Sequence, residues 1–366
     1  MYLDNTLDYF SIFLLICLIK CFQKSLISLS IDLKLEFVLL IDNKKNSKIG
    51  IISKMAVTVK SRSKSLKDTE LEISQNATLD AFLAEISKKN RNINTNRLRL
   101  TYQKESKFVS ITTDELLKGE VNRNGDVELF VKDLGPQISW RLVFLVEYFG
   151  PIFIHSVFYY LSTLKNVNEK FHSSSSEYNP VLNKILYLMV IAHYLKREFE
   201  SVFVHQFSNS TMPFFNLFKN SAHYWILNGM ISFCYFGYGF LLSDTTIESF
   251  YNLLGFSNVS LLIALFTVSE LWNLYIHVRL RQWGDTQKKL GNTTKRVAIN
   301  DGVFKILVAP NYTFEVWAWI WFTVVSKFNL FSLIFLIVSA TQMYLWAQKK
   351  NKKYGTKRAF LIPFIF

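Results

Sequence analysis

From Trp140 onward the chain contains long apolar runs, each close to the length that crosses a lipid bilayer. A hydrocarbon core about 30 Å thick needs roughly 20 residues of α-helix. Within it every backbone polar group must be hydrogen-bonded inside the protein, and runs of this length satisfy that condition as helices. We therefore expect a multispanning α-helical membrane protein with about six transmembrane helices, at approximately 142–163, 181–199, 222–243, 258–278, 307–326 and 328–348.

The distribution of basic residues predicts how these helices are oriented. The chain has 42 Lys and Arg against 28 Asp and Glu. Seven Lys and Arg lie in 279–305 and six in 349–358, whereas 244–257 has none. Because short basic loops stay on the cytosolic side of a membrane, both basic segments are expected there. With an even number of spans, the region before Trp140 and the C-terminus share that side. Topology thus explains the positive charge, and no nucleic-acid partner is expected.

The residues before the apolar runs predict a small soluble domain over 56–135. Its pattern combines strand-like alternation with one capped amphipathic helix. The candidate strands are 57–60, 71–73, 97–102, 109–111 and 127–131, and the candidate helix is 78–86. This order of strands and helix resembles a ubiquitin-like α+β domain, and a transmembrane domain over 140–366 follows it.

The first 54 residues fit neither part. Their apolar run, 9–22, resembles the core of a signal peptide, but Asp4 and Asp8 stand where basic residues are expected. A cleaved signal would also place the next domain in the lumen, against the charge pattern. We interpret 1–54 as an N-terminal extension, either absent from the mature protein or kept as an optional anchor. N-terminal sequencing of the natural protein tests whether it starts at Met55.

The histidines, cysteines and glycines exclude several kinds of site. The six histidines form no paired motif of the kind that binds di-iron in desaturases or serves elongase-type condensation. The three cysteines have no zinc spacing, so no metal is expected. There is no acyltransferase H-x-x-x-x-D pattern and no P-loop, and Gly237-Tyr238-Gly239 lies in an apolar run rather than after a strand. A Rossmann fold is therefore excluded.

Polar residues recur at the predicted cytosolic ends of the spans. Each group has a structural explanation: basic side chains reach toward the interface, polar pairs join helices, and tyrosines anchor at the membrane surface. Ionisable groups inside a membrane are nonetheless costly, and one shared pocket would explain all of them. The groups are Lys196-Arg197-Glu198-x-Glu200, Glu270 and Asn273 followed by Arg279 and Arg281, and Asn311-Tyr312-x-x-Glu315.

These groups and their neighbours carry a family resemblance over essentially 56–366. The motifs are Lys196-Arg197-Glu198-x-Glu200, Phe203-Val204-His205-x-Phe207, Thr211-Met212-Pro213, Asn216-x-Phe218-Lys219-Asn220, Pro310-Asn311-Tyr312-Thr313-Phe314-Glu315, Thr341-Gln342-Met343 and Ile362-Pro363-Phe364. They resemble the very-long-chain trans-2-enoyl-CoA reductases, whose C-terminal part is similar to steroid 5-alpha-reductase. The resemblance implies NADPH-dependent reduction of trans-2,3-enoyl-CoA to saturated acyl-CoA, the last step of very-long-chain fatty acid elongation in the endoplasmic reticulum membrane.

The resemblance also implies roles for individual residues. Tyr312 would be the catalytic acid and Lys196 its essential companion, because a phenol with a pKa of about 10 is a poor acid until a cation stabilises the phenolate. The residues expected around NADPH are Asn273, Arg281, Asn311, Glu315, Tyr354 and Arg358.

Two other functions remain open. The similarity to steroid enzymes allows a steroid or polyprenol enone reductase. A non-catalytic scaffold is also possible, in which the ubiquitin-like domain recruits the condensing enzyme, ketoreductase and dehydratase of the elongation cycle. Those enzymes, the enoyl-CoA substrate and the lipid bilayer are the expected partners of the enzyme as well. Substitution of Tyr312 by Phe separates the enzyme from the scaffold, since only an enzyme loses turnover with one hydroxyl.

Overall fold

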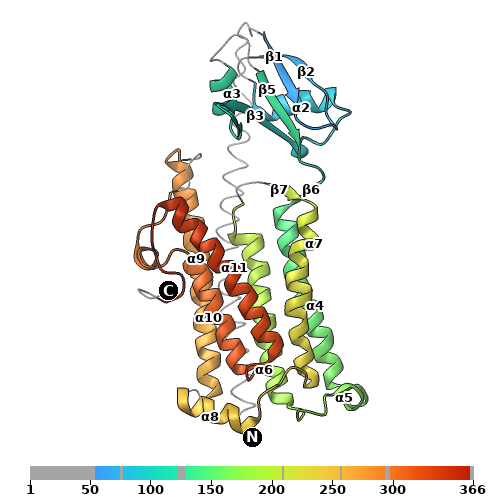
Figure 1. Ribbon diagram of the computed structural model, residues 1–366, viewed down its shortest axis with the longest axis vertical. Helices are drawn as coiled ribbons and strands as arrows, with labels where there is room; N and C mark the ends of the chain where they lie inside the picture. Colours follow the sequence, from blue (N-terminus) through green and yellow to red (C-terminus); the bar gives the residue numbers. More distant parts are fainter. Residues whose placement is uncertain are drawn as a thin grey trace, which may run out of the picture. The chain divides into compact units, whose positions relative to one another are not determined.

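The computed structural model describes residues 54–74, 77–121, 128–207, 210–255, 258–292 and 297–362. It divides into two compact units at the bond between Asp133 and Leu134. Figure 1 colours the first unit blue to teal and the second green to red. The predicted extension, 1–54, lies outside the described residues apart from Lys54, the first residue of the first strand.

The first unit is an α/β domain built on one mixed sheet. Its strands lie in the order β2-β1-β5-β3-β4. The central pair, β1 and β5, is parallel, with Val59 opposite Leu129, and the other neighbours are antiparallel. The elements are β1 (Lys54–Ser61), β2 (Thr69–Ser74), α2 (Leu79–Lys89), η1 (Thr95–Arg97), β3 (Leu98–Lys104), β4 (Lys107–Ser110), α3 (Asp114–Val121) and β5 (Glu128–Asp133).

Local sequence explains the central elements of this unit. Val57 and Val59 alternate with exposed residues along β1 and are fully buried, as expected of a strand with one face on a core. The Thr78 hydroxyl accepts a hydrogen bond from the Ala81 amide at 3.3 Å and so caps α2. Phe82 lies on the buried face of α2. The predicted strand at 57–60 and capped helix at 78–86 are confirmed, whereas α3 was not predicted.

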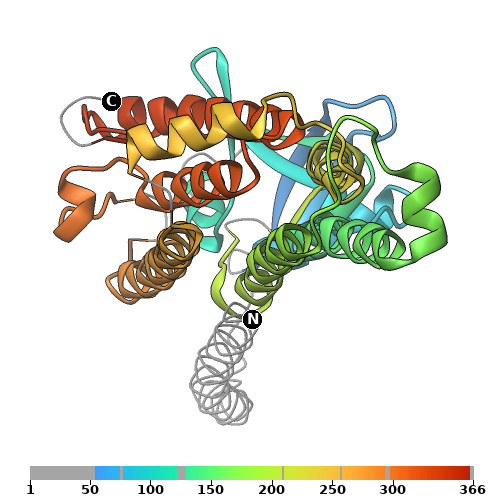
Figure 2. The same cartoon turned by 90° about the horizontal axis from the view of Figure 1, so that it is seen from below.

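The second unit is almost entirely helical. Helix α4 packs against α6, and α9 packs against α10; both pairs lie side by side in Figures 1 and 2. The elements are β6 (Gln137–Ser139), α4 (Trp140–Thr163), α5 (Lys165–Phe171), α6 (Pro180–Phe199), η2 (Glu200–Val204), β7 (Thr211–Pro213), α7 (Phe215–Ala222), η3 (His223–Asn228), η4 (Gly229–Phe236), α8 (Asp244–Leu254), α9 (Val259–Lys289), η5 (Gly302–Lys305), α10 (Pro310–Val325) and α11 (Leu330–Tyr354).

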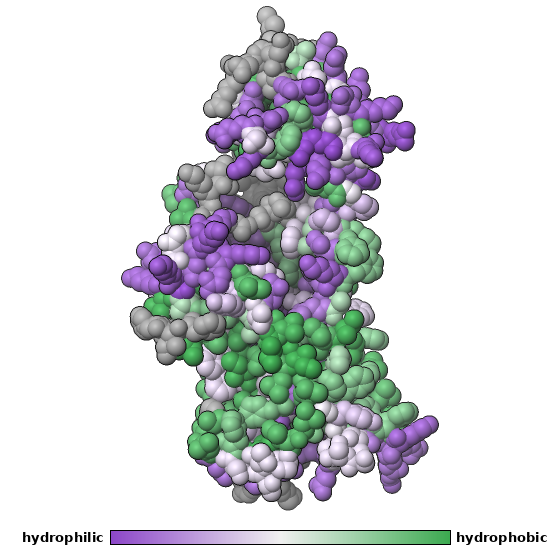
Figure 3. Space-filling model, in the orientation of Figure 1, coloured by the Kyte–Doolittle hydropathy of each residue, from purple (hydrophilic) through white to green (hydrophobic). Residues whose placement is uncertain are grey.

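Among the described residues, three helices are long and apolar enough to cross a membrane, namely α4, α9 and α11. They correspond to the predicted spans 142–163, 258–278 and 328–348. Figure 3 shows a hydrophobic band over one face of the helical unit, bordered by hydrophilic residues. A hydrophobic band of this kind is expected where a protein surface contacts the hydrocarbon core of a bilayer.

The other three predicted spans take different forms. Helix α6 coincides with 181–199 but carries Lys196 and Arg197 in its last turn. Helix α10, within 307–326, has only 16 residues and is about 24 Å long. The run 222–243 is a π-helical turn followed by a 3-10 helix. The 3-10 helix stops before Gly237, whose φ of 78° is a backbone conformation that favours glycine.

A close helix contact at Gly150 helps to position α4. The Trp225 ring lies against this glycine, so a Cβ built there would be 2.2 Å from Trp225 Cδ1. The Trp225 indole also donates a hydrogen bond to the Val146 carbonyl at 2.9 Å. Because Gly150 has no side chain, the Trp225 ring can pack directly against the backbone of α4.

Candidate active site

Helix α6 and the turn after it carry several charged residues of the site. His193 and Lys196 are three residues apart, so they share one face of the helix. Both are buried, at 2% and 5% exposure. Beyond Phe199 the chain continues as a π-helical turn, in which the His205 amide donates to the Glu200 carbonyl at 2.8 Å. Such turns are rare and frequent at functional sites, and this one places the Glu200 carboxylate in the interior.

Five buried or nearly buried residues from three helices form a closed ring of polar contacts. Lys196 Nζ lies 2.7 Å from Glu270 Oε2 and donates to Asn273 Oδ1 at 2.5 Å. Asn273 Nδ2 donates to Glu315 Oε2 at 3.1 Å. His193 closes the ring, with Nε2 3.4 Å from Glu315 Oε1 and Nδ1 2.7 Å from Glu270 Oε1. We call these five residues the polar ring.

A second group of contacts surrounds Arg197. Its guanidinium donates to Glu200 Oε2 at 2.7 Å and to the Tyr148 hydroxyl at 2.8 Å. It also lies 3.7 Å from Glu315 Oε2, which joins this group to the polar ring. His277 Nδ1 lies 3.0 Å from Glu200 Oε1. Helices α4, α6, α9 and α10 therefore meet around one connected set of charges.

The two groups together contain three carboxylates and two cations. Glu200, Glu270 and Glu315 face Lys196 and Arg197 within 4 Å. An unpaired buried charge costs several kcal/mol, and ionisable groups inside a membrane are expensive in the same way. Apolar side chains could have filled this part of the helical unit, but five ionisable side chains lie close together there. Such a cluster is typical of a functional centre.

Tyr312 lies beside this centre, in the first turn of α10. Its ring centroid is 5.9 Å from that of Trp346, and the Lys350 ammonium is 4.3 Å from the centre of its ring. The phenol is within electrostatic reach of Arg197 and Glu315. Within the described part of the chain, the Tyr312 hydroxyl forms no hydrogen bond, so it is available to a ligand.

Lys196, expected as the companion of Tyr312, is linked to the start of α10 through Asn273. The Lys196 ammonium contacts Glu270, Asn273 and, at 3.7 Å, Glu200. It reaches α10 through Asn273, whose amide donates to the Asn311 carbonyl at 2.7 Å. Among the described residues, the ammonium in contact with the Tyr312 ring belongs to Lys350 instead.

The residues predicted to hold the cofactor lie in three places. Asn273, Asn311 and Glu315 lie together at the polar ring. Arg281 is two turns further along α9, where it donates to Asp285 Oδ2 at 3.0 Å and to the Val204 carbonyl at 3.3 Å.

The remaining two come from the C-terminal segment. Tyr354 is the last residue of α11 and lies within electrostatic reach of Tyr312. The Arg358 guanidinium donates to the Ile299 carbonyl at 2.8 Å and to Asn300 Oδ1 at 3.2 Å, so it ties the C-terminal segment to the loop before α10.

One buried acceptor at this site fits a bound cofactor. Asn311 Oδ1 is buried and has no hydrogen-bond partner within the described residues. Buried polar atoms are almost always paired, so an exception requires an explanation. The carboxamide of a nicotinamide ring carries an NH₂ donor that matches this acceptor. Asn311 is next to Tyr312, so a group bound there would lie beside the phenol.

Three side chains near the π-helical turn have the donor atoms of a metal site. The ligand atoms of Glu200, His205 and His277 lie within 4.8 Å of one another. Burial, followed by the positive field of Arg197, lowers the pKa of His205 to about 3, which leaves the imidazole neutral. However, Arg197 already donates to Glu200 at 2.7 Å and lies 3.3 Å from His277 Nδ1. The guanidinium thus fills the space a cation would need.

Several residues of the centre were not assigned a role from the sequence. His193, Arg197 and Glu200 come from α6 and its π-helical turn, and Glu270 and His277 from α9. A local signal existed, because His193 and Lys196 repeat the three-residue spacing of Glu270 and Asn273. That spacing identifies a polar face on each helix, but it does not show that the two faces meet.

Comparison with known proteins identifies the group to which this chain belongs. Residues 210–366 match the 3-oxo-5-alpha-steroid 4-dehydrogenase family. The chain is 34% identical over 320 residues to an enoyl reductase of Schizosaccharomyces pombe, covering 85% of this chain and 99% of that one. It is 32% identical over 260 residues to the trans-2,3-enoyl-CoA reductase-like protein of Bos taurus, covering 69% and 68%. It is also 35% identical over 305 residues to the very-long-chain enoyl-CoA reductase of Dictyostelium discoideum, covering 80% of this chain and 93% of the relative, and it belongs to the same family.

Proposed function

We propose that this protein reduces trans-2,3-enoyl-CoA to saturated acyl-CoA with NADPH, as the last step of very-long-chain fatty acid elongation. Its relatives are named as reductases of this substrate class. The observation that carries the proposal is the pair Asn311 and Tyr312. Within the described residues, Asn311 Oδ1 is a buried acceptor without a hydrogen-bond partner, and it stands beside the Tyr312 phenol at the start of α10, next to the polar ring.

The reaction requires a hydride from the cofactor and two contributions from the protein. Bound NADPH supplies a hydride to Cβ of the enoyl thioester. The chain must stabilise the negative charge that develops on the thioester oxygen, and it must deliver a proton to Cα. Tyr312 is the proposed donor, and its hydroxyl is available for either task. General acid catalysis contributes roughly 10²–10⁴-fold, and one oxyanion donor about 10²–10³-fold.

The surroundings of Tyr312 support its role as an acid. The Lys350 ammonium lies over the Tyr312 ring, and a positive charge in that position would favour the phenolate that remains after proton transfer. Lys196 contributes through Asn273, since its contact with Asn273 Oδ1 turns the amide NH₂ toward Glu315 and the Asn311 carbonyl. We assign Lys196 the role of holding this part of the site in one orientation.

For the cofactor, we propose that Asn273, Asn311 and Glu315 bind the nicotinamide end. Asn311 Oδ1 offers the acceptor described above. Arg281, two turns along α9, is proposed to bind phosphate, for which a guanidinium provides bidentate donation.

Tyr354 and Arg358, on and after the last turn of α11, are proposed to border the cofactor from the C-terminal side. Arg358 has a structural role in addition, because it holds the loop at Ile299.

The proposed setting of the reaction is the endoplasmic reticulum membrane. We propose six spans, with α6, η3–η4 and α10 supplementing the three long apolar helices, and with the first unit and the C-terminus in the cytosol. The first unit, over 56–135, is proposed to be ubiquitin-like. Its strand order, with the parallel pair β1 and β5 at the centre, supports this. Residues 140–366 form the proposed catalytic domain, with the condensing enzyme, ketoreductase and dehydratase as partners.

The test is NADPH oxidation by detergent-purified protein with a long-chain trans-2-enoyl-CoA. Tyr312→Phe should retain the parental unfolding temperature and lose at least 10²-fold in kcat. The matched control is Tyr275→Phe on α9, where the tyrosine is 51% exposed, and it should retain activity. A Tyr312→Phe variant as active as the parent would show that the Tyr312 hydroxyl is not the proton donor. A parent protein that reduces steroid enones but not enoyl-CoA would favour the steroid reductase. A parent that reduces neither substrate would favour the scaffold.

A further inference from the structure

A large apolar cavity lies in the helical unit, and none of the helices that form the polar ring lines it. Its volume is about 490 Å³, within the range of small-molecule sites. All the residues that line it are aromatic or aliphatic. They include Phe158 and Leu161 of α4, Phe171 of α5, Phe233 and Phe236 of η4, and Phe331 of α11.

Hydrogen bonds fix the walls of this cavity. The Tyr238 hydroxyl donates to the Phe171 carbonyl at 2.8 Å and so joins the segment after η4 to α5. The Ser173 amide donates to the Phe236 carbonyl at 2.8 Å, and the Leu330 amide to the Gly239 carbonyl at 2.8 Å. Hydrogen bonds therefore hold three separate segments around the space, which is expected of a formed pocket.

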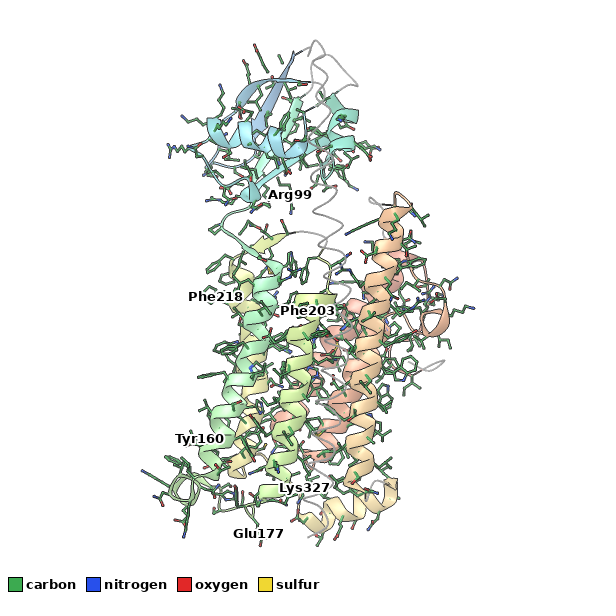
Figure 4. The ribbon with its side chains drawn as sticks, turned by 180° about the vertical axis from the view of Figure 1, so that it is seen from behind. Arg99, Tyr160, Glu177, Phe203, Phe218 and Lys327 are labelled. Atoms are coloured by element: carbon green, nitrogen blue, oxygen red, sulfur yellow. The ribbon has the colours of Figure 1, made fainter. Side chains whose placement is uncertain are left out.

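The cavity and Tyr312 lie at different levels along helix α11. Phe331 lines the cavity and Trp346 contacts the Tyr312 ring. The two residues are 15 positions apart in a continuous helix, which is about 22 Å. Figure 4 agrees: Tyr160, the neighbour of Leu161, lies toward the end of the helical unit marked by Lys327 and Glu177, opposite Phe203 and Phe218.

One face of α11 extends from the level of the cavity to the level of Tyr312. Phe331, Val338 and Leu345 are spaced by seven residues and so share one face of α11. Val338 is 40% exposed and Leu345 is 49% exposed. Gln342 is the polar residue between Val338 and Leu345 on this face, which leads from the cavity to the turn that contains Trp346.

We propose that the cavity binds the terminal methyl end of the acyl chain while the thioester lies at Tyr312. The inference rests on the proposed function and specifies its substrate. One leaflet of hydrocarbon is about 15 Å deep, so an acyl chain that reaches about 22 Å must be longer than the chains that fill a leaflet. Only very long chains would gain the contacts of the cavity, which would give the enzyme its preference for length.

The test is to fill the cavity and compare two substrates. Leu161→Trp places an indole in the cavity from α4. Leu164→Trp makes the same change three residues later, at a side chain that is 36% exposed and outside the lining. For each variant kcat/KM is measured with trans-2-tetracosenoyl-CoA and trans-2-hexenoyl-CoA.

We expect Leu161→Trp to reduce kcat/KM for tetracosenoyl-CoA by about tenfold, the loss of contacts of roughly two methylene groups. Hexenoyl-CoA, which cannot reach the cavity, should be reduced at the parental rate, and Leu164→Trp should resemble the parent with both. Equal effects on the two substrates, or none, would overturn the proposal. A parent inactive on both substrates would instead refute the proposed function.

A second measurement identifies the occupant directly. An enoyl-CoA with a diazirine at its last carbon should label peptides containing Phe171 or Phe331, and excess tetracosenoyl-CoA should suppress the label. Labelling confined to the segment around Tyr312 would overturn the proposal. So would labelling of the cavity that excess substrate does not suppress and that a diazirine phospholipid reproduces, because the occupant would then be membrane lipid.

Discussion

Nδ1 of His193 lies 2.7 Å from Oε1 of Glu270, and this contact joins α6 to α9 in the interior of the helical unit. The opposite nitrogen of the same imidazole faces Glu315 of α10 at 3.4 Å. One side chain thus links three helices, and both of its partners belong to the set of charges around the proposed catalytic centre.

Replacement of His193 by Phe should therefore disturb the centre although His193 has no proposed contact with substrate. Two buried carboxylates lose a partner, at a cost of about 3 kcal/mol in the free energy of unfolding. We expect kcat to fall at least tenfold while KM for the enoyl-CoA changes little, and His193→Gln, which retains one donor, to recover part of the loss. His223→Phe is the control, because His223 is half-buried and contacts Ser339 outside the polar ring. A His193→Phe enzyme with parental kcat would contradict the positioning role.

Removal of Lys196 tests whether the polar ring behaves as one unit. Lys196→Met leaves Glu270 without its cation and should destabilise the protein by about 3–5 kcal/mol. In the double variant Lys196→Met with Glu270→Gln the unpaired charge is gone, so the two losses should be less than additive, by about 0.5–3 kcal/mol. Chemical unfolding in detergent measures the four corners of this cycle. Strict additivity would show that the two residues do not interact.

The contact at Gly150 predicts a steric effect. Gly150→Ala would place a methyl group 2.2 Å from the Trp225 ring, so the ring must move. We expect a loss of about 1–3 kcal/mol. Gly284→Ala on α9 is the control, since its nearest neighbour is a flexible Gln206 side chain at 3.5 Å, and a helical alanine should be neutral or stabilising by about 0.5–1 kcal/mol. Equal unfolding temperatures for the two variants would refute the close approach.

His205 predicts a pH dependence of stability. Burial and then the field of Arg197 lower its pKa to about 3 in the folded protein, below an ordinary histidine pKa of about 6.5. Between these values the unfolded chain binds the proton and the folded chain does not, so stability should fall as the pH is lowered through this window, at up to about 1.4 kcal/mol per pH unit.

The measurement is the unfolding temperature at pH 7 and pH 5. His205→Gln should reduce the difference between the two values, whereas His172→Gln, in the segment after α5, should leave it as in the parent. An unchanged difference in His205→Gln would assign the acid sensitivity to other groups.

Periodicity and composition were sufficient to predict the elements whose character is local. The alternation of Val57 and Val59, the Thr78 cap and the three long apolar helices required no knowledge of distant residues. The same reasoning extended the run 222–243 into one span, but the chain there forms a π-helical turn and a 3-10 helix. Hydrophobicity measures whether a segment prefers an apolar environment, and it does not fix the hydrogen-bond pattern of its backbone.

The candidate site shows the same division. Residue type marked the polar groups that contain Asn273, Asn311 and Glu315, and the family resemblance suggested their role at the cofactor; the three residues lie together. The distances that join Lys196 to Asn273 and His193 to Glu270 span 77 residues of sequence each. Which polar face meets which depends on how α6, α9 and α10 pack, because a contact between helices is determined by the complementarity of whole surfaces. The polar ring, the place of Lys350 over Tyr312 and the apolar cavity therefore emerged only once the chain was folded.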